Sequence, residues 1–186
     1  MAKAAQLLGH YQLENAATAV AALEVLTGRG FNISRGSIIN GLAQVNWPGR
    51  FQILSYHPLI LVDGAHNPDG ARRLKQSIKQ YFAFDRAILV IGASCDKDIA
   101  GIVLELFPLF DKVIVTRSRH PRAMASPPIV AEFRKEGVDT QVVDEVPAAL
   151  SLALSLAGDR ALICVAGSLF VIAEAIEQAN RLCLTA

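Results

Sequence analysis

Short apolar runs alternate with segments of helical spacing from residue 87 onward, and this alternation limits the fold more than any other feature. The apolar runs predict strands at 87–91, 112–116, 140–143 and 161–165. The intervening segments predict helices at 98–109, 126–136, 147–157 and 169–180. Apolar strands that alternate with helices indicate a mostly parallel sheet covered on both faces. We therefore predict an α/β fold, a doubly wound sheet with helices on both faces.

The first part of the chain follows a different pattern, because it predicts two helices with no strand between them. Residues 12–26 form a helix that is apolar around most of its circumference and ends near Gly28. Ser34 is a suitable N-cap for a second, short helix at 35–42. This segment should lie across one side of the α/β core.

Charge and cysteine content limit the classes of partner. The net charge is +1, which gives no electrostatic case for binding nucleic acid or an anionic membrane. The three cysteines lack metal-ligand spacing, and their odd number fits a reducing compartment. No apolar stretch reaches the roughly 18–20 residues that span a bilayer, and no signal segment opens the chain. We expect a cytoplasmic protein that binds small molecules.

The stretch LVDGAHNPDG, at 61–70, combines a strand end with a helix start. A strand at 59–62 places Asp63 at its carboxyl end, while Asn67 and Pro68 suit the N-cap and first position of the next helix. Ligands of open α/β sheets bind at such places. Asp63 could accept hydrogen bonds from a sugar hydroxyl or an amine, and His66 lies beside it. The alternative is an ordinary Asp-Gly turn followed by a helix cap.

Two further polar residues are candidates for a binding site. Arg50 follows the Pro-Gly turn of WPGRFQ, where its guanidinium offers a planar fork for phosphate oxygens. A solvated surface arginine is the alternative. Asn15 lies inside the first predicted helix, and its amide could read the edge of a base. A buried asparagine satisfied by a neighbouring backbone group is equally compatible with the pattern.

Five sequence blocks together resemble a known family. They are GHYQLENAA at 9–17, WPGRFQ at 47–52, DGAHNPDGA at 63–71, DKD at 96–98 and GSLF at 167–170. Their order resembles the C-terminal domain of the folylpolyglutamate synthase family, which is bifunctional with dihydrofolate synthase in many bacteria and belongs to the Mur ligase superfamily. The resemblance implies a Rossmann-like Mur ligase C-terminal domain at 46–186, preceded by an inter-domain helical segment at 1–45.

The resemblance also implies a reaction and roles for individual residues. ATP phosphorylates a carboxylate of the folate (or of dihydropteroate), and the amine of L-glutamate then displaces phosphate from the acyl phosphate. Asn15 would contact the adenine, Arg50 the phosphates and Asp63 the ribose or its neighbourhood. His66 and Ser168 would bind glutamate or the acyl phosphate, with His66 as a candidate catalytic residue. Lys97 and the segment 117–122 also follow predicted strand ends, but the resemblance assigns them no role.

The chain departs from the family in two ways. The family has a covalently linked N-terminal ATPase domain with a glycine-rich phosphate loop and Mg ligands, whereas neither that loop nor GxGxxG occurs here. We therefore expect the glutamate-ligase domain alone, with ATP and Mg as cofactors, no metal ligand of its own and negligible turnover by itself. In addition, Tyr11 stands where the family often has histidine, and His10 precedes it.

Two other functions are compatible with the sequence. One is a stand-alone module that binds a nucleotide or metabolite without catalysis. The other is a related Mur-type amino-acid ligase acting on cell-wall precursors, which shares the chemistry. A Rossmann-type oxidoreductase would share only the fold, and the missing GxGxxG argues against it.

Overall fold

The structure is a computed structural model that describes residues 9–184. It divides into two compact units, one ending at Pro48 and the other beginning at Gly49. Residues 1–8 of the predicted inter-domain segment lie outside the described residues. None of the described helices is both long and apolar enough to cross a bilayer.

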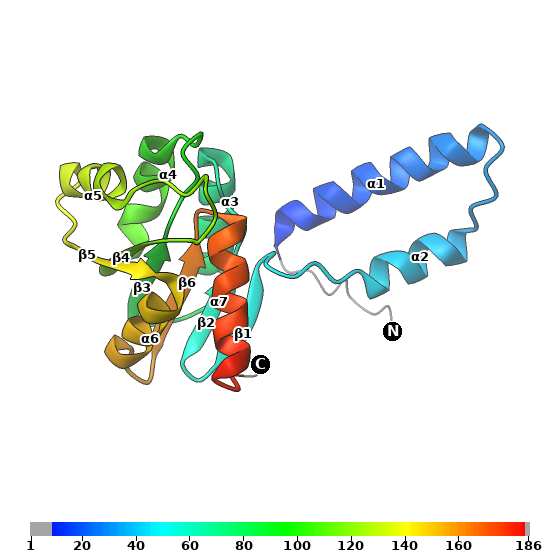
Figure 1. Cartoon of the computed structure of the whole chain (residues 1–186). Helices are drawn as coiled ribbons and strands as arrows, with labels where there is room; N and C mark the ends of the chain where they lie inside the picture. Colours follow the sequence, from blue (N-terminus) through cyan, green and yellow to red (C-terminus); the bar gives the residue numbers. More distant parts are fainter. Residues whose placement is uncertain (1–8, 185–186) are drawn as a thin grey trace. The chain divides into compact units, whose positions relative to one another are not determined.

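Within its described residues, 9–48, the first unit contains two helices, as the sequence predicts (Figure 1). α1 spans His10–Gly28, and Arg29 is its C-cap. α2 spans Arg35–Gln44, and the hydroxyl of its N-cap Ser34 accepts a hydrogen bond from the Ser37 backbone N–H at 3.0 Å. α1 ends at Gly28 and α2 begins directly after Ser34, as the sequence predicts. Several apolar side chains of the helices and of the connection between them are more than half exposed: Leu13, Val25, Phe31 and Ile39.

The second unit is built on a six-stranded sheet in the order β1-β2-β6-β3-β4-β5. β1 pairs antiparallel with β2 at one edge, and all other pairs are parallel. The strands are β1 (Gln52–Tyr56), β2 (Leu59–Val62), β3 (Arg86–Ile91), β4 (Lys112–Arg117), β5 (Thr140–Glu145) and β6 (Ala161–Ala166). The mostly parallel sheet is thus confirmed. β5 is the exception to apolar strands, because it is an edge strand without a buried residue.

Five helices cover the two faces of the sheet (Figure 1). They are α3 (Pro68–Tyr81), α4 (Ile99–Leu106), α5 (Ser126–Lys135), α6 (Val146–Leu156) and α7 (Leu169–Arg181). α3, α4 and α5 pack on one face around Leu74, Ile102 and Phe133. α6 and α7 pack on the other around Leu150 and Ile172. The fold is therefore doubly wound, as predicted.

The strand order places a topological switch point at the carboxyl end of β6. β6 lies between β2 and β3, whose following helices α3 and α4 cover one face. The helix that follows β6, α7, covers the opposite face. Chain segments that leave neighbouring strands toward opposite faces leave space between them, and ligands of open α/β sheets bind there. The loops after β2, β3 and β6 therefore surround the position at which a ligand of such a sheet binds.

Candidate functional site

The turn that carries Arg50 is fixed by backbone contacts. The Gly49 N–H donates to Gln52 Oε1 at 2.8 Å, and the Gly49 carbonyl accepts from the Gly64 N–H at 2.9 Å. Gly49 has φ 79°, and a Cβ there would lie 2.9 Å from Ile172 Cγ2. Only glycine fits this position without strain. The exposed Arg50 side chain is therefore presented from a fixed backbone next to the end of β2.

Phe51, the residue after Arg50, anchors the same turn through its buried side chain. It adopts φ 45°, which is uncommon for a residue with a side chain, and it is only 3% exposed. Its ring packs against Tyr81 and Phe82, with ring centroids 6.1 and 5.9 Å apart. Unusual backbone conformations at functional sites are held by surrounding packing. Phe51 was missed as a site residue from sequence, although an aromatic residue two positions after a Pro-Gly turn was a usable signal.

Asp63 joins this turn to the end of β2. Its Oδ2 accepts from the Phe51 N–H and its Oδ1 from the Ala65 N–H, both at 2.8 Å. Its own N–H donates to the Val165 carbonyl of the neighbouring strand at 3.0 Å. Asp63 is 7% exposed. Each carboxylate oxygen thus already has a backbone partner, and the side chain fixes the backbone on both sides of itself.

Arg50 and His66 both belong to segments that adjoin Asp63, because Arg50 precedes Phe51, whose N–H donates to Asp63 Oδ2. Burial raises the pKa of the Asp63 carboxyl above its ordinary value, while the hydrogen bonds from Phe51 and Ala65 act in the opposite direction. The charge of Arg50 also lowers that pKa. The structure therefore brings together the cationic and anionic side chains of the two sequence blocks.

His66 is held in one tautomer by the same loop. Its Nδ1 lies 2.7 Å from the Gly64 carbonyl oxygen. Because a carbonyl only accepts hydrogen bonds, Nδ1 carries the proton, and Nε2 of the neutral ring keeps a lone pair. His66 is half-buried and precedes Asn67, the N-cap of α3, whose side chain accepts from the Gly70 N–H at 2.7 Å. Its Nε2 could accept a proton from a substrate.

Ser168 lies at the neighbouring strand end. The Gly167 N–H donates to the Ala65 carbonyl at 2.9 Å, so the loop after β6 is bonded to the loop after β2. Ser168 is 4% exposed, and its hydroxyl caps α7 by accepting from the Phe170 N–H at 3.3 Å. The start of α7 presents backbone N–H groups that favour an anion. Binding of glutamate by Ser168 stays a prediction.

Asn15 lies in the first unit, on α1. Its amide donates from Nδ2 to Gln12 Oε1 at 3.0 Å, within the same helix. This differs from the alternative considered above, in which a backbone group satisfies the side chain. The proposed adenine contact stays a prediction, and the side chain of His10 is outside the described part of the structure.

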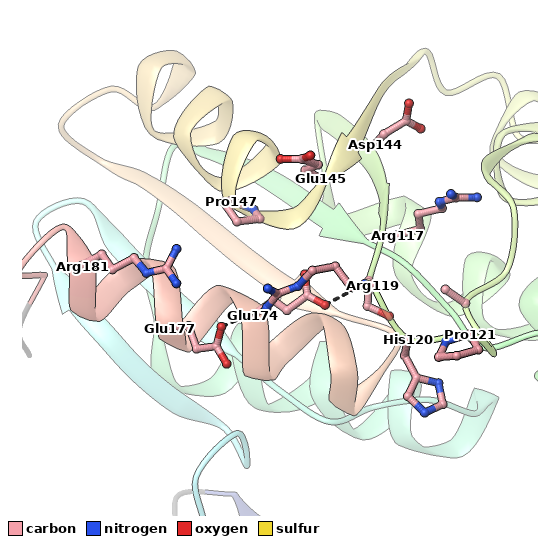
Figure 2. A pocket seen from close by; sticks show the side chains of 12 residues that line it. Arg117, Arg119, His120, Pro121, Asp144, Glu145, Pro147, Glu174, Glu177 and Arg181 are labelled. Atoms are coloured by element: carbon pink, nitrogen blue, oxygen red, sulfur yellow. Dashed lines mark hydrogen bonds and ion pairs between the residues drawn. The ribbon is translucent and has the colours of Figure 1, made fainter.

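No metal site comes together among residues 9–184, where no three His, Cys, Asp or Glu side chains gather to hold an ion. A cavity of about 670 Å³ does lie at the carboxyl ends of β4 and β5, beside α7 (Figure 2). Charged residues of both signs line it; residues 117–121 of the segment noted above are among them, but none of the residues that were assigned a role is. We place the candidate site at the Arg50, Asp63 and His66 cluster, because its geometry is fixed by buried contacts.

The fold and this cluster define a doubly wound α/β domain of the class that binds ligands at the carboxyl edge of its sheet. The chain belongs to the Mur ligase family, since the model of the "Mur ligase, glutamate ligase domain" matches residues 49–169. It is 33% identical to the dihydrofolate synthase/folylpolyglutamate synthase of Mycobacterium tuberculosis over 159 residues, which is 83% of this chain and 33% of the relative.

Solved structures agree with this family. The Mycobacterium tuberculosis folylpolyglutamate synthase complexed with ADP and AMPPCP is 30% identical, with a TM-score of 0.80 over 97% of this chain and 41% of that one. A bifunctional folylpolyglutamate synthase/dihydrofolate synthase with Mn, AMPPNP and L-glutamate bound is 29% identical, with a TM-score of 0.74 over 90% of this chain and 39% of that one. The chain thus spans well under half the length of these relatives.

Proposed function

We propose that this chain is the glutamate-ligase domain of an ATP-dependent ligase that adds L-glutamate to folate or dihydropteroate. In this proposal residues 1–45 form the inter-domain segment and residues 46–186 the ligase domain. The names of the relatives and the ligands in their structures, ADP, AMPPCP, AMPPNP and L-glutamate, support it. The observation that carries it is Arg50 on a turn fixed by the Asp63 carboxylate.

The cationic side of the site would act on the nucleotide. Transfer of a phosphoryl group to a carboxylate develops charge on phosphate oxygens, and a guanidinium can bind two of them through its planar fork. Arg50 would make this contact. Asp63 would keep the turn of Arg50 in place and lie near the ribose, and Asn15 would contact the adenine.

The other side of the site would act on glutamate and the acyl phosphate. The attacking amine must lose its proton, and the free Nε2 lone pair of His66 is suited to accept it, directly or through water. The N–H groups at the start of α7, capped by Ser168, would stabilise negative charge on the acyl phosphate or on a glutamate carboxylate.

The remaining parts of the enzyme would lie in the additional length of the relatives. A covalently linked ATPase domain would supply the phosphate loop and the ligands for a divalent metal, since the described residues here gather no such ligand set. Closure of the two domains would bring Arg50 against the phosphates. We place the ligase in the cytoplasm, in agreement with its three free cysteines, and we propose neither nucleic acid nor membrane as a partner.

An assay of product formation tests this function. A protein that joins this chain to the additional domain of its relatives is incubated with ATP, L-glutamate and either a folate or a cell-wall precursor. We expect ADP and a folate heavier by one glutamate residue, detected by mass spectrometry. Turnover of the cell-wall precursor alone would support the Mur-type alternative. ATP binding by the 186-residue chain at about micromolar affinity, measured by calorimetry, would favour a stand-alone binding module.

A further inference from the structure

Glu174 is a buried carboxylate that the reaction outlined above does not use. It lies on α7 and is 7% exposed. Its Oε1 accepts from the backbone N–H of Arg119 at 2.8 Å, and its Oε2 lies 3.4 Å from Arg119 Nε. Figure 2 shows Arg119 extending toward Glu174 and Glu177 on α7. Burying a carboxylate costs desolvation free energy, so the contacts that it makes must compensate for this cost. Here those contacts are with Arg119, in the loop 118–122 that follows β4.

The same loop is held against the first turn of α7. The ring of His120 stacks on that of Phe170, with centroids 3.6 Å apart and planes within 9°. Phe170 follows the N-cap Ser168 by two residues, and its N–H donates to the Ser168 hydroxyl. Residues 118–122 therefore lie beside the helix start that we assign to the acyl phosphate or glutamate.

Contacts on the far side of the loop attach it to the chain that follows β3. The Cys95 N–H donates to the Arg122 carbonyl at 3.0 Å, and Arg122 Nη2 lies 3.0 Å from Asp96 Oδ1. The Met124 N–H donates to the Ala93 carbonyl at 2.8 Å. The loop thus connects the segment that follows β3 with α7, the helix that follows β6. Glu174 is the buried attachment at one end of this connection.

We propose that Glu174 is a positioning residue, whose carboxylate holds the loop 118–122 against α7 so that His120 and Phe170 form one wall of the glutamate subsite. This inference rests on the proposed function. Glu174 itself does not contact substrate, and it acts by fixing the backbone of Arg119. Loss of the acceptor leaves that N–H without a partner and lets the loop leave α7, which widens the subsite.

Glu177 provides a matched control on the same helix. Its Oε2 lies 3.1 Å from Arg119 Nη2, but its side chain is 55% exposed and has no bond to the loop backbone. Exposed ion pairs of this kind contribute little to structure. Glu174→Ala should therefore release the loop, and Glu177→Ala should leave it in place. Glu174→Gln keeps an oxygen that can accept from the Arg119 N–H and should restore the position.

Steady-state kinetics on the domain-joined ligase test the role. We expect Glu174→Ala to raise the KM for glutamate by about tenfold or more with little change in kcat or in the KM for ATP, because a displaced wall weakens binding of that substrate. Glu174→Gln and Glu177→Ala should stay within about threefold of wild type. A folded Glu174→Ala protein with unchanged glutamate KM would overturn the proposal. If that variant does not fold, Phe170→Ala, which removes the same wall at a partly exposed position, must raise the glutamate KM instead.

NMR of the 186-residue chain tests the positioning without catalysis. Stacking on Phe170 shifts the ring protons of His120 to high field, and this shift should disappear in Glu174→Ala and persist in Glu177→Ala. Persistence of the shift in Glu174→Ala would also overturn the proposal. A wild-type ligase that adds no glutamate while the NMR shifts behave as expected would instead contradict the proposed function.

Discussion

Replacement of Asp63 by alanine should destabilise the second unit by an amount that the structure allows us to estimate. The substitution leaves two buried donors, the Phe51 and Ala65 N–H groups, without an acceptor. Each unpaired buried donor costs about 1–3 kcal/mol. The burial that raises the pKa of Asp63 shows that the charge itself is unfavourable there, and its removal offsets part of this loss. We expect the free energy of unfolding to fall by about 2–4 kcal/mol at neutral pH.

Urea unfolding of the 186-residue chain, followed by circular dichroism, measures this quantity. Asp63→Asn keeps one acceptor oxygen and should lose less, about 1–3 kcal/mol. Asp85→Ala is the control, because Asp85 is mostly exposed and pairs with Arg160 at 3.2 Å, so its loss should stay within about 0.5 kcal/mol. A loss at Asp63→Ala no larger than that of Asp85→Ala would show that the two hydrogen bonds do not hold the turn, and the structural role of Asp63 would be refuted.

Two further predictions concern stability. Gly49→Ala should cost more than Gly137→Ala in the same unfolding assay, because both have positive φ (79° and 73°) but only Gly49 would also place its Cβ against Ile172. We expect about 1 kcal/mol at Gly137 and at least about twice that at Gly49, and equal losses would contradict the packing. Asp63 should also make stability depend on pH. Its pKa is raised on folding above the ordinary 3.8, so the folded state binds the proton more tightly and this contribution to stability is lost as pH rises above 3.8. Wild type should thus gain relative to Asp63→Asn between pH 7 and about pH 4 in urea titrations, and a relative loss would contradict the shift.

The architecture could be predicted from sequence because its signals are local. Strand 59–62 and the second helix start at Arg35 are where the apolar pattern and the N-cap place them. Of the described strands, only β5 differs from the expected apolar pattern, because it lies at an edge of the sheet, while the antiparallel β1 is compatible with a mostly parallel sheet. β5 pairs with β4 alone, and most of its residues are exposed. β1 pairs antiparallel with β2, which requires only a short connection between the two strands.

The details of the site could be predicted only in part. The sequence blocks identified Arg50, Asp63 and His66, and the structure joins their backbone segments through the Asp63 carboxylate and the Gly64 carbonyl. It was not visible from sequence that both Asp63 oxygens bond the backbone, since one of the partners, Phe51, is set by the return of the chain to the end of β2. The contact between Glu174 and Arg119 joins residues 55 positions apart, and no local pattern predicts such a pair.

Kinetics of Arg50→Ala in the domain-joined ligase test the central claim most directly, which is that this turn presents a cation to the nucleotide phosphates. Arg86→Ala is the control, because the exposed Arg86 is the first residue of β3 and lies at the amino ends of the parallel strands, away from the carboxyl ends where the site lies. We predict a loss in kcat/KM for ATP of about 10²-fold or more at Arg50, as expected for a charge contact in the transition state, and an activity close to wild type at Arg86. An Arg50→Ala ligase within about threefold of wild type would contradict the account.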